Sequence, residues 1–120
     1  GGGAAGGEGG TADADRKRKH VPNDELEFVF VPDANVERDY QMPPLKMPKL
    51  RASGRLKVSN MKRYLLKKLQ LKASPASVEI CCNGDPLGDE LSLTFINRTR
   101  WLDPTEEVQL TYRFGEEGMF

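Results

Sequence analysis

The amino-acid sequence predicts a small α+β domain in which one amphipathic helix covers one face of a mixed β-sheet. Three observations lead to this fold class. Residues 25–31 alternate in side-chain direction with the period of a strand and are rich in β-prone types. Residues 59–71 carry an apolar stripe at helical spacing. Two further alternating segments, 78–82 and 108–114, follow this helix, and a lone helix can bury its stripe only against such a sheet.

Two strands are expected before the helix. In the first, ELEFVFV, the side chains of Leu26, Phe28 and Phe30 share one face. Residues 32–48 follow it and contain four prolines. We expect them to form a long connection, because proline lacks the N–H that a central strand needs. The second strand is the short segment KLRAS, residues 49–53, which places its two apolar side chains on one face and ends before a glycine.

The helix itself is expected in SNMKRYLLKKLQL, with Ser59 as its N-cap. Its basic residues alternate with the apolar stripe, and the Ser74-Pro75 pair ends it. The predicted core combines this stripe with the inward positions of the later strands: Tyr64, Leu65, Leu69, Ile80, Cys82, Leu110 and Tyr112.

The segment after the helix contains a strand, a turn and a closing strand. VEICC is a strand, NGDP has turn chemistry, and PLG is expected to form a very short return strand. LSLTFI fits either a helical turn or a strand, and VQLTYRF closes the domain. The order of these elements is that of a ubiquitin-like β-grasp with a mixed sheet of four to five strands.

Charge and composition divide the chain further. The 120 residues balance 18 basic against 18 acidic side chains, but residues 41–77 contain ten Lys and Arg and no Asp or Glu. We expect residues 1–23 to be a flexible Gly-rich and basic tail or linker, 24–116 the folded domain and 117–120 a C-terminal tail. The tail contains a basic run that suits nuclear import or phosphate contact: Arg16, Lys17, Arg18 and Lys19. No apolar run approaches the length of a membrane span.

The two adjacent cysteines do not predict a chemical site. Neighbouring strand residues point to opposite faces, so Cys81 and Cys82 are poorly placed to chelate one ion, and the single histidine, His20, lies in the tail. Cys82 is expected in the core and Cys81 on a half-exposed face. We expect no metal, no cofactor and no catalytic residue, because no histidine is placed to activate a Ser or Cys nucleophile.

Several short segments between about residues 25 and 115 match one known family, and they include Lys62-Arg63-Tyr64-Leu65, Ile80-Cys81-Cys82-Asn83, Leu87-Gly88, Leu93-Thr94-Phe95, Thr99-Arg100-Trp101 and Leu110-Thr111-Tyr112-Arg113. With these segments the sequence resembles the RAWUL domain, the ubiquitin-like C-terminal domain of Polycomb group RING finger proteins. The segments CN, LG and TRW are most similar to the branch found in variant, autism-susceptibility-associated Polycomb complexes. The short link from Lys72 to Ser77 favours the Polycomb RING finger side over the companion RING-type ligases, whose RAWUL domains usually carry a long insertion there.

The resemblance implies a nuclear, non-catalytic module that recruits an accessory subunit of Polycomb repressive complex 1 for transcriptional repression on chromatin. Any histone ubiquitin ligation by the parent protein would depend on a RING finger, which two cysteines cannot build. A conjugated modifier of the ubiquitin type is disfavoured, because such modifiers end in Gly-Gly and this sequence ends in Gly118-Met119-Phe120.

The expected partner site is the second strand, which lies at a sheet edge in a β-grasp fold and could accept a strand or hairpin. RAWUL domains are known to accept such segments, and Ala52 is expected to offer one main-chain donor. The nearby cations would favour an acidic partner, so the site comprises Lys49, Leu50, Arg51, Ala52, Ser53, Lys57, Lys62 and Arg63. The alternative function is nucleic-acid binding by the basic helix and adjacent strand, for which we expect weak, non-specific affinity at most. The oligomeric state is left open.

Overall fold

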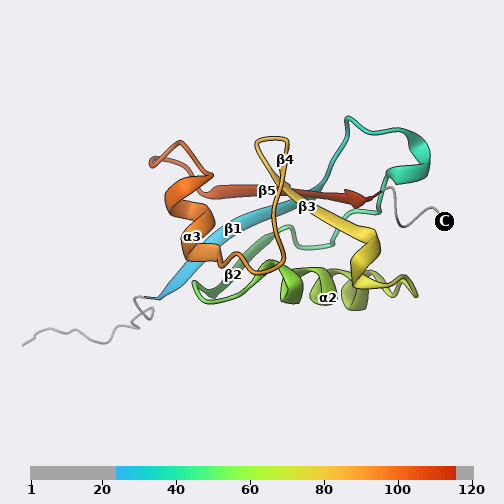
Figure 1. Cartoon of the computed structure of the whole chain (residues 1–120), viewed down its shortest axis with the longest axis horizontal. Coiled ribbons are helices and arrows are strands. Elements are labelled where there is room, and N and C mark those ends of the chain that lie inside the picture. Colours follow the sequence, from blue (N-terminus) through green and yellow to red (C-terminus); the bar gives the residue numbers. More distant parts are fainter. Residues whose placement is uncertain (1–23, 116–120) are drawn as a thin grey trace, which may run out of the picture.

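A computed structural model describes residues 24–115 as one mixed sheet with a long helix packed across one face (Figure 1). The two tails and the basic run 16–19 lie outside the described residues. In chain order the elements are β1 (Glu25–Pro32), the 3-10 helix η1 (Arg38–Tyr40), β2 (Lys49–Ser53), α2 (Val58–Leu69), the 3-10 helix η2 (Pro75–Ser77), β3 (Val78–Cys82), β4 (Asp85–Pro86), α3 (Leu93–Thr99) and β5 (Val108–Phe114).

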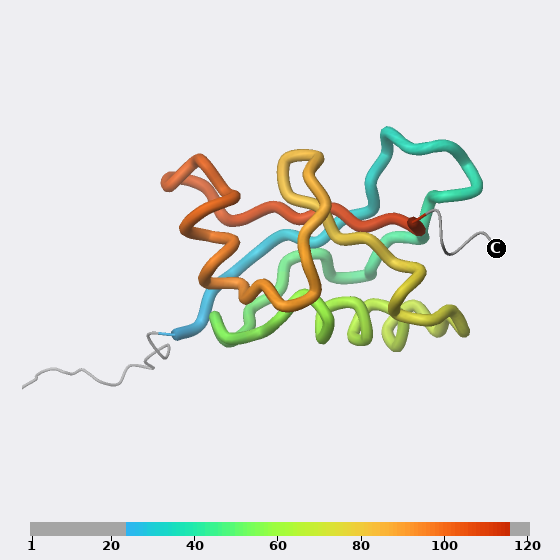
Figure 2. The backbone as a smooth tube through the Cα atoms, viewed as in Figure 1, coloured from blue at the N-terminus to red at the C-terminus, as the bar shows by residue number. Residues whose placement is uncertain are grey.

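The sheet has the strand order β2-β1-β5-β3-β4, which confirms the predicted β-grasp fold. β1 and β5 run parallel at its centre, and the other neighbouring strands are antiparallel. In the tube view the first and last strands lie side by side although they are far apart in the sequence (Figure 2). β2 therefore occupies one edge of the sheet, as expected, with a single strand beside it.

The core lies between α2 and the inner face of the sheet. Leu65, Ile80, Leu110 and Tyr112 are fully buried and Cys82 nearly so, as predicted, and Leu69 packs at the margin of this cluster. The prediction for Tyr64 is wrong, because its side chain is 37% exposed. The buried face of α2 is instead made by Val58, Met61, Lys62, Leu65 and Leu66, so Tyr64 lies at its border.

The start of α2 also differs from the prediction. The helix begins at Val58, one residue before the predicted N-cap, and Lys57 in the N-cap position makes no side-chain cap. Carbonyl groups from a distant loop replace the cap: the N–H of Val58 donates to Leu91 (3.0 Å) and that of Ser59 to Asp89 (3.1 Å). The loop before α3 therefore fixes the beginning of α2.

The turn after β3 is a tight hairpin. Asn83 and Gly84 have φ values of 53° and 85°, as the Asn-Gly pair predicts. The return strand β4 is Asp85–Pro86, one residue earlier than expected. The ambiguous segment is helical, because Ser92 caps α3 by accepting a hydrogen bond from the N–H of Phe95 (3.1 Å).

Candidate partner-binding site

The open side of β2 presents main-chain groups that pair with no described strand. The N–H of Phe30 donates to the carbonyl of Pro48 (2.8 Å), and that of Gly54 donates to the carbonyl of Asp24. In an antiparallel pair every second residue bonds to the neighbouring strand, so the main-chain groups of Leu50 and Ala52 face β1. The outward groups are therefore those of the odd-numbered residues Lys49, Arg51 and Ser53.

This pairing corrects the expectation for Ala52. Its N–H belongs to the β1–β2 ladder, opposite Leu26, and is not offered to a partner. The carbonyl of Ser53 is also taken, because it accepts from the N–H of Leu56 (3.0 Å). Lys49 and Arg51 thus keep both an outward donor and an outward acceptor, which is the pattern that an incoming strand needs.

An apolar pocket of about 240 Å³ lies beside this edge, between β2 and α2. Leu50 and Ala52 border it from the strand, and Met61 and Tyr64 border it from the helix. The remaining lining residues are Phe28, Phe30, Arg51 and Leu56. The inward side chains of a strand added to β2 would lie over this pocket, because they would continue the face of Leu50 and Ala52.

A second, more open groove of about 580 Å³ shares Leu50 and Tyr64 with the apolar pocket. It runs toward the C-terminal end of α2 and is bounded by the prolines and Met47 of the preceding loop. Met47 is 75% exposed, so its apolar side chain is accessible at the border of this groove. Together the two hollows make a continuous, mainly apolar track along β2.

The cations of β2 lie on the opposite face of the sheet and already have partners. The guanidinium of Arg51 donates to the carboxylate of Glu27 across the β1–β2 pair (2.8 Å). The ammonium of Lys49 lies 3.3 Å from the carboxylate of Glu107. The Arg51 guanidinium also holds the pKa of Glu27 below its ordinary value. These two charges are therefore less available to an acidic partner than the sequence alone indicates.

The three remaining predicted site residues belong to α2 and its approach. Lys62 is buried, and its ammonium donates to the exposed carboxylate of Asp89 (2.7 Å), so it ties α2 to the neighbouring loop. Lys57 pairs with Ser92 in an isolated β-bridge. Arg63 is exposed and donates to the side chain of Asn60 (3.1 Å). The structure thus brings only residues 49–53 together at the edge.

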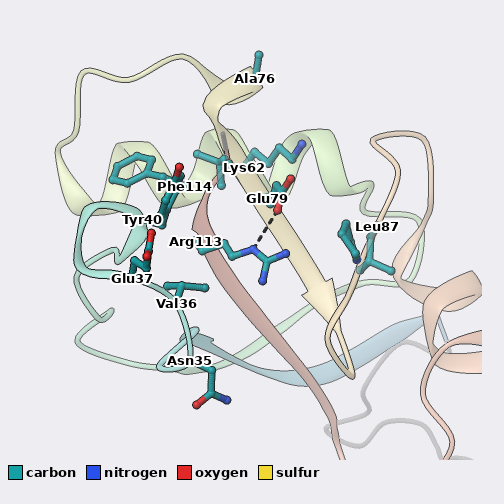
Figure 3. A pocket seen from close by; sticks show the side chains of 13 residues that line it. Asn35, Val36, Glu37, Tyr40, Lys62, Ala76, Glu79, Leu87, Arg113 and Phe114 are labelled. Carbon is teal, nitrogen blue, oxygen red and sulfur yellow. Dashed lines mark hydrogen bonds and ion pairs between the residues drawn. The ribbon is translucent and has the colours of Figure 1, made fainter. Parts of the chain in front are cut away.

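A hollow of about 840 Å³, larger than the two beside β2, lies elsewhere, at the end of the sheet near η1 (Figure 3). Arg113 extends into it and donates to Glu79 (2.9 Å) and to Asp33 (3.0 Å). None of its lining residues is a Ser, Cys or His. Across residues 24–115 no three His, Cys, Asp or Glu side chains gather as metal ligands, and no helix there is long and apolar enough to cross a membrane.

The cysteines are buried free thiols. Cys82 faces the core as predicted, but Cys81 is fully buried as well, contrary to the expectation of half exposure. β4 folds back beside it and places Pro86 opposite Cys81, while Thr111 of β5 flanks its other side. Burial raises the pKa of both thiols, which disfavours the reactive thiolate form.

The fold places the protein in the ubiquitin-like class. The crystal structure of Trypanosoma brucei ATG8 superposes with a TM-score of 0.64 over 81% of this chain and 77% of that chain. The sequence identity is 17%, so the likeness is one of fold alone.

The family follows from the sequence. The model of the RAWUL domain, described as RING finger- and WD40-associated ubiquitin-like, matches residues 49–113, which is more than half of the chain. The chain belongs to the RAWUL family, whose members are ubiquitin-like protein-interaction domains. The matched region begins at the first residue of β2 and so includes the whole exposed edge.

Sequence reasoning found the edge strand and missed the pocket beside it. Tyr64, Met61 and Leu56 line that pocket. Tyr64 and Met61 belong to α2 and Leu56 precedes it, and an apolar residue at any of these positions fits a core equally well. The one available signal was the width of the apolar stripe on α2, which is broader than one buried face needs.

Proposed function

We propose that this chain is the non-catalytic interaction domain of a Polycomb repressive complex 1 subunit, and that it recruits an accessory subunit by strand or hairpin addition to β2. The observation that carries the proposal is the coincidence of a sheet edge that pairs with no other described strand and an apolar pocket that the added strand would cover. Main-chain hydrogen bonds would supply affinity, and alternate side chains entering the pocket would supply selectivity.

The family membership supports the class of function, and the resemblance to Polycomb RING finger proteins supports the particular complex. A nuclear location belongs to the same proposal and rests on this resemblance and on the basic run 16–19. The structure alters the expected chemistry of the partner. Because Lys49 and Arg51 are paired within the domain, selectivity would come mainly from bulky apolar side chains rather than from acidic ones.

The test uses two substitutions at one residue. Arg51→Pro removes an outward donor, and an edge strand tolerates proline where the N–H faces solvent. Arg51→Ala is the matched control, because it loses the same side chain and keeps the donor. With the full chain as bait in nuclear extract, we expect the wild type and Arg51→Ala to recover Polycomb accessory subunits and Arg51→Pro to recover far less.

Two controls separate the parts of this proposal. Circular dichroism must show that Arg51→Pro is folded. Equal recovery by the folded proline variant would place the interface on another surface, and recovery of no Polycomb subunit by any bait would refute the assignment to that complex. For the recovered subunit, amide exchange measured by NMR should slow at Lys49, Arg51 and Ser53, while Leu50 and Ala52 should already be protected in the free domain.

A further inference from the structure

The basic block of the sequence is divided by the fold into paired and unpaired cations. Lys49, Arg51 and Lys62 each lie within 4 Å of a carboxylate. Arg63, Lys67 and Lys68 on the exposed side of α2 make no ion pair with any described residue. The block is therefore not one electrostatic surface, and three of its seven cations without a described ion pair share the exposed side of α2.

The geometry of these three residues makes a strip along α2. Arg63 and Lys67 are four residues apart, so they are neighbours along the helix surface with a rise of about 6 Å between them. Lys68 adjoins them and borders the open groove, which Lys46 also lines. α2 lies below the sheet in Figure 1, so its outer side is turned away from the strands. We call Arg63, Lys67, Lys68 and Lys46 the cationic strip.

No described acidic side chain forms an ion pair with the strip. No Asp or Glu occurs between residues 41 and 77, and Asp89, which contacts α2, is bound by the buried Lys62. The Arg63–Lys67 spacing puts two like charges together on the helix, an arrangement that disfavours the helix rather than supporting it. The folded domain thus carries repulsive cations at its surface, and an external polyanion would neutralise them.

We propose that the cationic strip binds the phosphate backbone of double-stranded nucleic acid without reading its sequence. Three of the four groups are lysines, which contact phosphates as flexible point charges. The one guanidinium, Arg63, is already engaged with Asn60. Arg63 and Lys67 line none of the three pockets described above, whereas Lys46 and Lys68 border the open groove. Arg63 and Lys67 can therefore be reached by a rigid duplex that would not enter the groove. This function is additional to partner recruitment at β2.

The experiment measures binding of a DNA duplex of about 20 base pairs to the full chain at several salt concentrations. Four phosphate contacts predict a slope of about −3.6 in a plot of log association constant against log salt, in addition to any contribution of residues 16–19. The triple substitution Arg63→Ala, Lys67→Ala and Lys68→Ala should reduce the magnitude of this slope by about 3. Alanine favours helix, so these exposed changes should preserve the fold.

The matched control removes the same number of exposed cations from the region of α3: Arg55→Ala, Arg98→Ala and Arg100→Ala. We expect this variant to keep nearly the wild-type slope. Equal losses from the two triple variants would mean that net charge alone matters, and would overturn the proposal. A slope that changes only when Arg16, Lys17, Arg18 and Lys19 are replaced by alanine would also overturn it. Displacement of the DNA from the strip by an equimolar poly-glutamate peptide would do the same, because the occupant would then be an acidic protein segment.

Discussion

At the scale of single residues, Tyr64 and Leu65 are neighbours on α2 with opposite environments. Leu65 is fully buried against the sheet, whereas Tyr64 borders the pocket beside β2 with more than a third of its surface exposed. Lys68 lies over the Tyr64 ring, 5.8 Å from its centroid. One residue therefore belongs to the stability of the domain and the other to its candidate interface.

Alanine substitutions distinguish these roles. Leu65→Ala should lower the free energy of unfolding by about 2–5 kcal/mol, because it leaves a cavity in the core. Tyr64→Ala should cost clearly less stability and should weaken partner binding at β2. Urea unfolding of both variants checks the first statement. Similar losses of stability in the two variants would contradict this division of roles.

At the scale of the elements, the pairing of β1 and β2 is linked to pH by one cross-strand ion pair. Arg51 lowers the pKa of Glu27 in the folded state. A depressed carboxyl pKa adds stability above the ordinary pKa of glutamate, and this contribution is lost as the pH falls through the lowered value. Both side chains are about half exposed, so salt should weaken the effect.

The pair can be tested by titration. Arg51→Ala should raise the pKa of Glu27 toward its ordinary value, as followed by the NMR shift of the Glu27 carboxyl carbon. Any loss of stability in Arg51→Ala should be largest near neutral pH and should shrink in acid, where Glu27 is protonated in both proteins. An unchanged Glu27 pKa in the variant would mean that the two side chains are not paired in solution.

The same scale shows which features the sequence could predict. Strands with clear alternation, such as KLRAS, were found with correct bounds because the period depends only on neighbouring residues. The start of α2 was missed because its first N–H groups bond to carbonyls about 30 residues away. Cys81 was misplaced although its strand was found, because it is fully buried in a strand that has neighbours on both sides, β4 and β5. The edge site was predicted from the strand order, but its pocket depends on how α2 packs against β2.

At the scale of the whole molecule, distant segments are tied together at a few close contacts. Tyr112 in β5 donates its hydroxyl to the carbonyl of Pro43 (2.8 Å), which holds the long proline-containing connection against the sheet. Gly54 packs so closely against Thr94 and Asp24 that a Cβ atom would not fit, which joins the end of β2 to α3. The connection that precedes β2 and the residue that follows it are thus both held by elements far away in the sequence.

These contacts predict that the described domain unfolds in one cooperative step. The buried cluster is continuous and draws residues from β1, α2, β3, α3 and β5 together with Met42 and Leu87, and single domains of this size usually unfold without intermediates.

The single tryptophan, Trp101, follows α3 and donates its indole N–H to the carbonyl of Glu106 (3.1 Å), so its fluorescence reports on the α3 region. Far-ultraviolet circular dichroism reports on all elements. The two transitions in urea should coincide, and Leu65→Ala should shift both by the same amount. A fluorescence change that precedes the loss of ellipticity would contradict this prediction, because it would show that α3 melts alone. The loop carbonyls that hold the start of α2 would then be lost before the sheet unfolds, and β2 would not be a rigid strand for a partner to pair with.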